Sequence, residues 1–383
     1  MAVPDSSLTT PAPSQELHSL PSRESWAASP IFIVGASRSG TTLLREILNK
    51  HPLVWIADET HYFDDLRIRL HRSQHPTLTS AQLRECEEYF IALGSTWYGG
   101  RSDPSKSSLD LASFRREVRL LGSHPDAYFE TYCRFRAQQH GKIRWGEKTP
   151  RHVFRLEEIM TAYPTAQVVT MLRDPRAVVA SYRDWHRATY SKPSDPVGLR
   201  ADRERARRSY HPVLCSLLWR AATLTALQAR EKFGSTRLLL LRYEDLVSNP
   251  DLTLRALTTW LGIPYTLGMK DVPVVLSSYE GCEDIRGLWR EPLERWKEKL
   301  DGREVAAVET CCRSVMKAFS YEPMVPHAGL HGLSLLLTTP FAAVRAGVAN
   351  RKRLGAGGAY VGRRLGIFLR SSNKERLCSR PIL

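Results

Sequence analysis

The sequence predicts an α/β fold in which helices flank a parallel β-sheet. Short runs of β-branched and aromatic residues alternate with longer segments that carry apolar residues at helical spacing. The first run leads through a glycine-containing loop directly into a helical pattern. The composition is that of a globular protein, because 42% of the 383 residues are hydrophobic and 25% are charged. Global disorder, collagen-like repeats and a polytopic membrane protein are therefore excluded.

The elements follow one another in a regular order. The first strand is predicted over residues 30–35, which are apolar throughout and end at a glycine, a pattern typical of a strand buried on both faces. A helix over residues 42–50 follows, with four apolar residues on one face: Leu43, Leu44, Ile47 and Leu48. Later strands are predicted over residues 54–57, 143–145, 167–172 and 236–241. Later helices are predicted over residues 60–72, 151–162, 175–188, 211–232, 251–261 and 302–319.

The chain divides into a leader, one domain and a tail. Residues 1–29 are rich in Pro, Ser and Thr and are predicted to be a disordered leader. Residues 30–326 contain all the predicted strands and form a single domain, with a polar and mostly helical insertion at about 73–140. Residues 327–383 form a basic, partly apolar tail. The arginine-rich segment 187–209 is predicted to be a loop followed by a solvated helix.

The net charge of +15 is unevenly distributed. Residues 331–383 contain ten Lys and Arg residues but one acid, Glu375, so they carry +9, whereas the first 330 residues carry only +6. A surplus of this kind favours an anionic partner such as a nucleotide, a nucleic acid, an acidic substrate or a membrane surface. Because the domain itself is only mildly basic, nucleic acid is not expected to be the partner.

The cysteines and the N-terminus indicate the compartment. The seven cysteines are scattered, form no C-x-x-C motif and have no histidine at zinc-site spacing. The N-terminal residues lack a basic segment followed by an apolar stretch, and the chain has no N-x-[ST] sequon. These features predict a reduced, cytoplasmic protein without a metal site.

The loop after the first strand is the most specific local feature. Residues 35–42 read Gly-Ala-Ser-Arg-Ser-Gly-Thr-Thr and open a helix, where backbone N–H groups and the helix dipole favour a phosphate. The spacing equals that of the Walker A motif, but Thr41 stands at the lysine position. The missing lysine argues against hydrolysis of ATP or GTP, and the cation of this loop is Arg38. The alternative is a strand–helix turn that binds no ligand.

The segment from Ser37 to Leu43 resembles the 5′-phosphosulfate loop of sulfotransferases that use 3′-phosphoadenosine 5′-phosphosulfate (PAPS). The resemblance implies a sheet related to that of P-loop NTPases and kinases, with residues 30–326 as one catalytic domain. The arginine makes the loop most similar to the tyrosylprotein sulfotransferase-like and related bacterial group. In this family no metal is essential, and the 5′-phosphate and sulfuryl group are held by the loop, here Arg38, Ser39, Gly40, Thr41 and Thr42.

A second element resembles the 3′-phosphate site of the same family. The strand predicted over 167–172 ends at Arg173, and Ser181 follows eight residues later in the next helix. The resemblance implies that both hold the 3′-phosphate, a role that suits a forked arginine donor and a short serine donor. The alternative is an exposed arginine at a strand end and a serine on a helix surface.

Three later segments also resemble the family, in the same order along the chain. Tyr243, in an R-Y-E-D-L segment, is expected near the nucleotide or in the core. Arg295, in an R-W segment, is expected at a phosphate or on the surface. Residues 319–323 resemble the end of the family's domain.

Sulfuryl transfer requires a base for the acceptor proton and cations for the departing oxygen. The resemblance implies Glu59 as the base, because it precedes a threonine just after the second strand and stands 21 residues after Arg38. Asp58 and His61 are the alternative bases, in which case Glu59 only caps the next helix. Arg38 and Lys148 are the implied cations, with Lys148 in a Glu-Lys-Thr-Pro segment after the third strand.

The predicted function is transfer of the sulfuryl group of PAPS to an acceptor hydroxyl, with 3′-phosphoadenosine 5′-phosphate (PAP) as the product. A carbohydrate or glycolipid hydroxyl is the first choice, and a tyrosyl or small-molecule hydroxyl the second. The aromatic candidates for the acceptor site are Trp97, Tyr98, Tyr128, Tyr132, Trp185 and Tyr190. The alternatives are a P-loop nucleotide kinase and a non-catalytic nucleotide- or membrane-binding protein.

The tail, residues 328–383, combines an apolar stretch with basic residues. Residues 332–344 are thirteen uncharged residues interrupted by Pro340, which is short for a membrane span. Basic residues mixed with Leu, Ile and Phe follow. The pattern predicts contact with an anionic membrane surface, which would make a cytoplasmic protein peripheral at the membrane. Packing against the domain and disorder are the alternatives.

Overall fold

The computed structural model describes residues 28–71, 78–95, 109–122, 124–187, 204–273, 286–288, 290, 293–324 and 332–350. The predicted leader up to residue 27 and the tail beyond Asn350 lie outside these residues. So do most of the arginine-rich segment and three of the predicted acceptor-site aromatics, Trp97, Tyr98 and Tyr190.

Within the described chain, five parallel strands form one sheet in the order β2-β3-β1-β4-β5. Their bounds are β1 Ile31–Gly35, β2 Val54–Ala57, β3 Arg144–Lys148, β4 Gln167–Leu172 and β5 Leu238–Arg242. The first strand lies in the centre, and all five of its residues are buried, as expected for an apolar strand covered on both faces. The predicted α/β class with a parallel sheet is confirmed.

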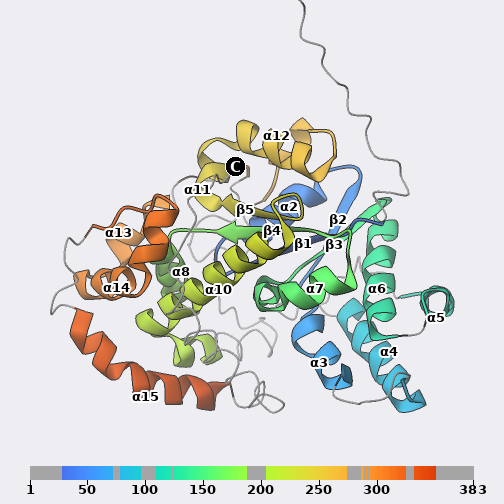
Figure 1. The fold of residues 1–383 in the computed structure, drawn as a ribbon, viewed down its shortest axis with the longest axis horizontal. Helices are drawn as coiled ribbons and strands as arrows, with labels where there is room; N and C mark the ends of the chain where they lie inside the picture. The colour runs from blue at the N-terminus through green and yellow to red at the C-terminus, as the bar shows by residue number, and fades with distance from the viewer. Residues whose placement is uncertain are drawn as a thin grey trace, which may run out of the picture.

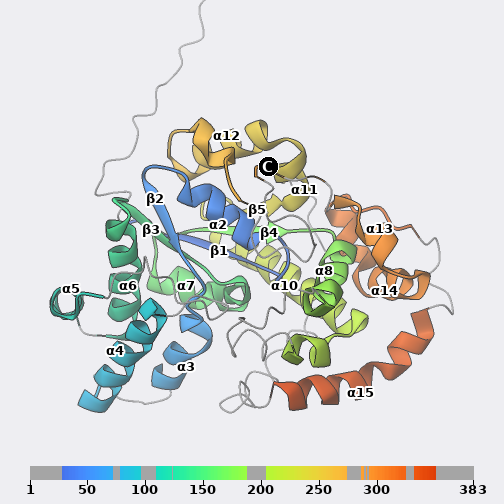
Figure 2. The ribbon, with the colours of Figure 1, turned by 180° about the vertical axis from the view of Figure 1, so that it is seen from behind.

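Helices cover both faces of the sheet (Figures 1 and 2). One face packs against α2 (Thr41–Asn49), α11 (Tyr243–Ser248) and α12 (Pro250–Leu261). The other packs against α6 (Pro125–Gln139), α7 (Leu156–Ala162), α10 (Pro212–Phe233) and α14 (Gly302–Ala318). Alternate residues of β1 point to the two faces, since Ile33 joins the first core and Phe32 the second.

The insertion between β2 and β3 is helical where it is described. It comprises η1 (Tyr62–Asp64), α3 (Leu66–His71), α4 (Ser80–Ser95), α5 (Leu111–Leu120) and α6. Aromatic rings join it to the sheet, because Phe129 stacks on Phe32 at 6.1 Å and on Tyr62 at 4.8 Å between ring centroids. Two of the predicted acceptor-site aromatics, Tyr128 and Tyr132, are buried in this core.

Two segments predicted as single helices are each divided. The first becomes η1 and α3, because Asp65, between them, leaves helical geometry at φ −123° and ψ −88°. The second becomes η2 (Pro150–Arg155) and α7, because Arg155 adopts φ −123° and turns its guanidinium to Asp64, 3.2 Å away. At the second place a tertiary contact thus overrides the helical pattern.

The third strand is longer than predicted. Lys148 was expected in the loop after this strand, and that expectation is wrong, because Lys148 is its last residue. The strand continues because β3 lies between β1 and β2, so both neighbours provide backbone partners: Ile33 lies opposite Lys148, and Ala57 lies opposite Glu147.

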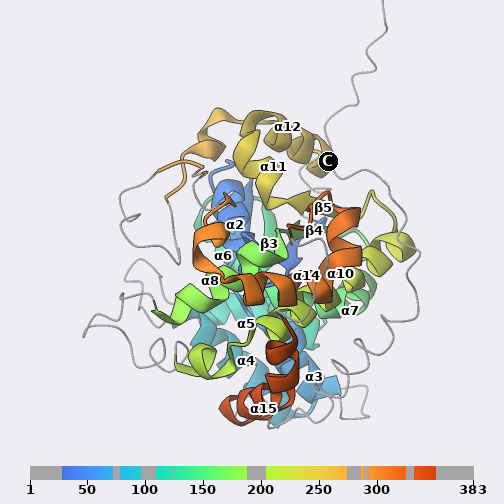
Figure 3. The same cartoon turned by 90° about the vertical axis from the view of Figure 1, so that its left-hand side faces the viewer.

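Helices α13 (Trp296–Lys299), α14 and α15 (Leu333–Ala349) lie together with α8 (Pro175–Arg187) on the α10 side, as Figure 3 shows. The short helix η3 (Leu267–Lys270) instead packs against α2, on the other face of the sheet. Helix α15 packs against α10 and α14. This part of the tail therefore packs against the domain along one face of α15, and its contact with a membrane surface stays a prediction. No helix in the described part of the chain has the length and apolar character needed to cross a membrane.

Candidate active site

The loop between β1 and α2 is shaped by two glycines and one arginine. Gly35 has φ +146°, and a Cβ there would lie 2.5 Å from the carbonyl oxygen of Met171 in β4. Gly40 has φ +92°, and its Cβ would lie 2.5 Å from the ring of Tyr243. Arg38 adopts a left-handed conformation with φ +72°. The sequence folds into this tight loop because glycine tolerates both the close contacts and the positive φ values.

The loop ends where α2 begins, with backbone donors available for an anion. Gly40 is the N-cap residue of α2, and no side chain caps the first N–H groups. The side chain of Ser39 is fully buried, and its Oγ has no hydrogen-bond partner among the described residues. An uncapped helix N-terminus beside an unpaired hydroxyl fits a bound phosphate.

The two predicted phosphate elements meet at this loop. The Arg38 Nε donates to Ser181 Oγ of α8 at 3.0 Å, and the Arg38 guanidinium lies 5.9 Å from the ring centre of Trp185, one turn further along the same helix. Arg173, directly after β4, donates from Nη1 to the Arg38 carbonyl oxygen at 3.1 Å. Its guanidinium also lies 4.4 Å from the centre of the Tyr243 ring. The structure therefore brings these four predicted residues together, with Trp185 beside them.

Arg295 lies at the start of α13. It is the N-cap residue of α13 and is followed by Trp296, whose ring centre lies 4.1 Å from the guanidinium carbon of Arg176. That contact places α13 against the first turn of α8. The assignment of Arg295 to a phosphate stays a prediction.

On the other side of the loop, Lys148 is buried between two carboxylates. Its Nζ lies 2.7 Å from Glu59 Oε1 and 3.4 Å from Asp58 Oδ1. It also lies 3.4 Å from the Thr42 hydroxyl in the first turn of α2. The side chain is fully buried, so its ammonium is charged only at the cost of desolvation that these partners offset. Lys148 and Glu59 thus reach the loop from β3 and from the segment after β2.

The three predicted bases are in different environments. Burial raises the pKa of Asp58, but the Lys148 and Arg45 charges outweigh it and hold the pKa at about 2. Arg45 lies 3.3 Å from Asp58. Burial lowers the pKa of His61, although the Glu59 charge opposes this. The His61 Nε2 lies 3.6 Å from Glu59 Oε2, so the two side chains are adjacent.

Glu147, which has no predicted role, holds the segment that carries the predicted bases through hydrogen bonds to Thr60. Its carboxylate is fully buried and accepts hydrogen bonds from the Thr60 N–H and the Thr60 hydroxyl, both at 3.0 Å. It also accepts from the Thr149 hydroxyl and lies 3.1 Å from His152 Nδ1. Burial raises the pKa of Glu147, but His152 and these hydrogen bonds lower it by more, so the pKa lies below its ordinary value. The sequence feature that points to this role is a glutamate directly before Lys148 at the end of a buried strand, because a buried carboxylate requires polar partners.

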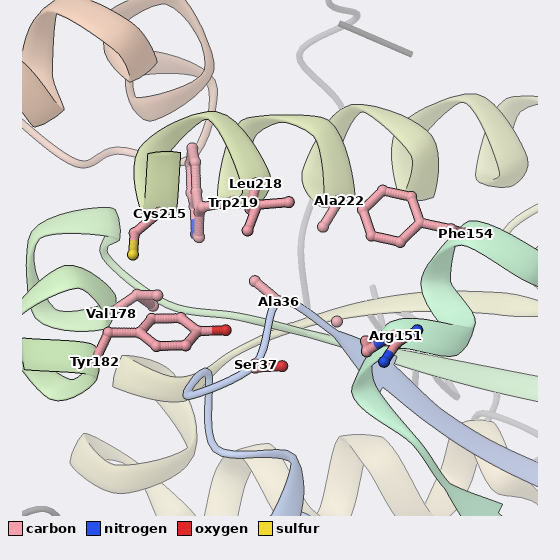
Figure 4. A pocket seen from close by; sticks show the side chains of 11 residues that line it. Ala36, Ser37, Arg151, Phe154, Val178, Tyr182, Cys215, Leu218, Trp219 and Ala222 are labelled. Carbon is pink, nitrogen blue, oxygen red and sulfur yellow. The ribbon is translucent and has the colours of Figure 1, made fainter. Parts of the chain in front are cut away.

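A cavity lies beside the loop, on the α10 side of the sheet (Figure 4). Ala36 and Ser37 of the loop line it on one side, and Leu218, Trp219 and Ala222 of α10 line it on the other. Its ends are formed by α8 and η2, through Val178, Tyr182, Arg151 and Phe154. The Trp219 Nε1 donates to the Arg173 carbonyl oxygen at 2.9 Å, so the cavity wall is tied to the phosphate element.

Comparison with known proteins identifies the family. Residues 30–266 match the model of the sulfotransferase family, and this is more than half of the chain. The protein therefore belongs to the sulfotransferase family, as its phosphate loop predicted.

Individual relatives are distant. An omega-hydroxy-beta-dihydromenaquinone-9 sulfotransferase, Stf3, of Mycobacterium bovis is 26% identical over 62% of this chain and 63% of its own length. A protein-tyrosine sulfotransferase of Drosophila melanogaster is 23% identical over 76% of this chain and 52% of its own length. The chain thus spans less than two thirds of these curated relatives. Among solved structures, the sulfotransferase domain of the Synechococcus PCC 7002 olefin synthase has a TM-score of 0.47 and 19% identity, and covers 77% of this chain and 96% of its own.

Proposed function

We propose that the protein transfers the sulfuryl group of PAPS to an acceptor hydroxyl. The observation that carries this proposal is the position of the phosphate loop between two sets of side chains. Arg38 of the loop contacts Ser181 and lies against Arg173, whereas Thr42 at its other end contacts Lys148. One anion-binding loop is therefore in reach of both a phosphate site and a cation–carboxylate pair.

The donor would be held by groups that the fold already positions. The N–H groups at the start of α2, the Ser39 hydroxyl and Thr41 would bind the 5′-phosphate and the sulfuryl group. Arg173 and Ser181 would bind the 3′-phosphate, with Tyr243 beneath the Arg173 guanidinium. The donor supplies an activated sulfuryl group with a phosphate as the leaving group.

In the transfer step, the acceptor oxygen forms a bond to sulfur while the bond from sulfur to the bridging oxygen breaks. Glu59 would accept the hydroxyl proton, and the electron pair of the broken bond would remain on the 5′-phosphate of PAP. Arg38 and Lys148 would stabilise that developing charge, because Arg38 belongs to the loop and the Lys148 ammonium contacts the loop at Thr42. The Glu59–Lys148 contact would orient the carboxylate before the acceptor enters.

We propose a carbohydrate or glycolipid hydroxyl as the first choice of acceptor and a tyrosyl or small-molecule hydroxyl as the second. The names of the relatives cover this range, since they include a carbohydrate sulfotransferase of Homo sapiens, the protein-tyrosine enzymes and the menaquinone enzyme. The cavity in Figure 4 is lined by loop residues, and Trp185 on α8 lies beside Arg38, so both could offer apolar contact to an acceptor.

The test is transfer of label from ³⁵S-PAPS to a panel of glycolipids, oligosaccharides, tyrosyl peptides and phenols, with and without a metal chelator. The wild-type protein should label at least one acceptor, and chelation should leave the rate unchanged. Arg38→Ala should abolish labelling while the fold persists, and Arg303→Ala, an exposed arginine on α14, is the matched control. Transfer at the wild-type rate by Arg38→Ala would overturn the assignment.

Thermal shift separates the donor from other nucleotides. PAP should stabilise the wild-type protein more than ATP or GTP, because Thr41 replaces the lysine that contacts a triphosphate. A larger shift with ATP would instead support the nucleotide kinase alternative.

A further inference from the structure

Helix α15 exposes a continuous apolar stripe. Leu337, Phe341, Val344 and Val348 are 67%, 80%, 69% and 61% exposed. Their spacing of four, three and four residues places them on one face of the helix. We call these four residues the α15 stripe. Isolated exposed apolar residues are common, but a continuous row along a helix indicates a contact surface.

The orientation of this helix is fixed by its other face. Ala342 is buried, and Gly332 lies so close to α14 that a Cβ would come within 3.2 Å of the Ala307 nitrogen. At the far end, the Asn350 amide donates to Ser209 Oγ at 2.9 Å, and Arg345 donates to the Arg208 carbonyl oxygen at 3.0 Å. Because both ends of α15 are attached to the domain, the stripe must face away from it.

The charge around the stripe has one sign. The chain contains no Asp or Glu between Glu322 and Glu375, and this stretch has eight Lys and Arg residues. Three of them, Arg351, Lys352 and Arg353, directly follow the residue that ends α15. An apolar surface next to an unbalanced basic segment is complementary to an anionic membrane surface.

We propose that α15 docks the protein on an anionic membrane, with the stripe inserted among the lipids and the basic residues at the headgroups. A second copy of the chain is a poorer occupant, because both copies carry the same positive charge and their contact would gain no charge complementarity. In all three views α15 lies at the same end of the molecule as α3, the helix that follows Glu59 and η1, and α12 lies at the opposite end (Figures 1, 2 and 3). The proposal is independent of the sulfotransferase chemistry.

The experiment is flotation of the full-length protein with vesicles of phosphatidylcholine, either pure or containing about 30% phosphatidylglycerol. The wild-type protein should float with the anionic vesicles and not with the neutral ones, and added salt should weaken binding. Phe341→Glu combined with Val344→Glu should lower the bound fraction roughly tenfold or more. The matched control is Leu252→Glu combined with Leu267→Glu, since these two leucines are 74% and 71% exposed at the α12 end.

Three results would overturn the proposal. The first is a wild-type protein that does not float, and the second is an α15 variant that floats as well as the wild type. The third is a wild-type dimer that the same variant converts to a monomer without any vesicle binding, which would assign the stripe to a second copy. The thermal shift with PAP should be equal in the wild type and both variants, which separates loss of docking from loss of the fold or of the donor site.

Discussion

At the scale of single residues, the site distinguishes two neighbouring carboxylates. Asp58 is paired with both Arg45 and Lys148, and its pKa of about 2 makes it a weak base. Glu59 shares Lys148 and lies beside His61. This difference favours Glu59 over Asp58 as the base, and His61 stays as the alternative.

Replacing Glu59 tests the choice of base. Glu59→Gln should lower kcat roughly 10²- to 10⁴-fold, because the amide cannot accept the acceptor proton. PAP affinity measured by calorimetry should change little, since Asp58 still balances the charge of Lys148. The control is Glu85→Gln on the exposed face of α4. A His61→Ala variant with the larger loss, beside an active Glu59→Gln, would transfer the role to His61.

The depressed pKa of Asp58 predicts a pH-dependent contribution to stability. The carboxyl group binds protons more weakly in the folded state than in the unfolded state, where its pKa is 3.8, so its contribution is complete only above about pH 5. The contribution should be on the order of 2 kcal/mol and should be lost as the pH falls toward 2. In urea unfolding, the gap between the wild type and Asp58→Asn should therefore narrow between pH 5 and pH 3. A constant gap would contradict the assigned charge state.

At the scale of elements, the phosphate loop depends on backbone geometry more than on any side chain. Gly40 combines a positive φ with a close approach to Tyr243, and the same ring packs on Arg173. Tyr243 thus couples the conformation of the loop and the start of α2 to the position of Arg173. The site can be disturbed there without removing a polar group.

The Gly40→Ala substitution tests this coupling. It should destabilise the protein by roughly 1–3 kcal/mol and abolish the thermal shift with PAP, because the new Cβ displaces the Tyr243 ring. Gly94→Ala in α4 is the control, since nothing lies within 4 Å of a Cβ there. A Gly40→Ala protein with normal PAP binding would show that the loop accommodates the methyl group.

Most strands of the sheet could be predicted from the sequence, because β1, β2, β4 and β5 are largely apolar runs. The division of the second helix at Arg155 and the greater length of β3 could not be predicted, because both depend on contacts with residues that are distant in the sequence. Arg155 turns to Asp64 from 91 residues away, and Lys148 lies opposite Ile33 in the neighbouring strand. Helical periodicity carries no information about such partners.

At the scale of the whole molecule, the strand order positions the site. β1 lies between β3 and β4. The loop follows β1, Lys148 ends β3 and Arg173 follows β4, so all three lie at one edge of the sheet. The C-terminal helices α13 and α14 pack against α8, the helix that follows Arg173. Arg176, in the first turn of α8, pairs with the fully buried Glu309 of α14 at 2.8 Å.

The buried Arg176–Glu309 pair predicts an effect on the free energy of unfolding of the whole protein. Glu309→Ala should lower the free energy of unfolding by roughly 3 kcal/mol, because it removes one of the two carboxylates that pair with Arg176 and the acceptor of the Met324 N–H. Glu298→Ala, an exposed position on α13, should change it by less than about 0.5 kcal/mol. Urea unfolding measures both, and similar values for the two variants would argue against the role of this pair.

The sequence alone determined the α/β class, the phosphate loop and the family, because these reside in contiguous residues whose spacing is readable along the chain. Only the tertiary structure decided which side chains meet. The Glu59–Lys148 contact joins residues 89 positions apart, and the Arg38–Ser181 contact joins residues 143 apart. The tertiary structure also decided that Glu147 accepts hydrogen bonds from Thr60, next to Glu59. It likewise decided that one face of α15 is buried and the other exposed. The reason is physical: burial and pairing depend on how strands order and helices pack, and a local pattern does not encode that order.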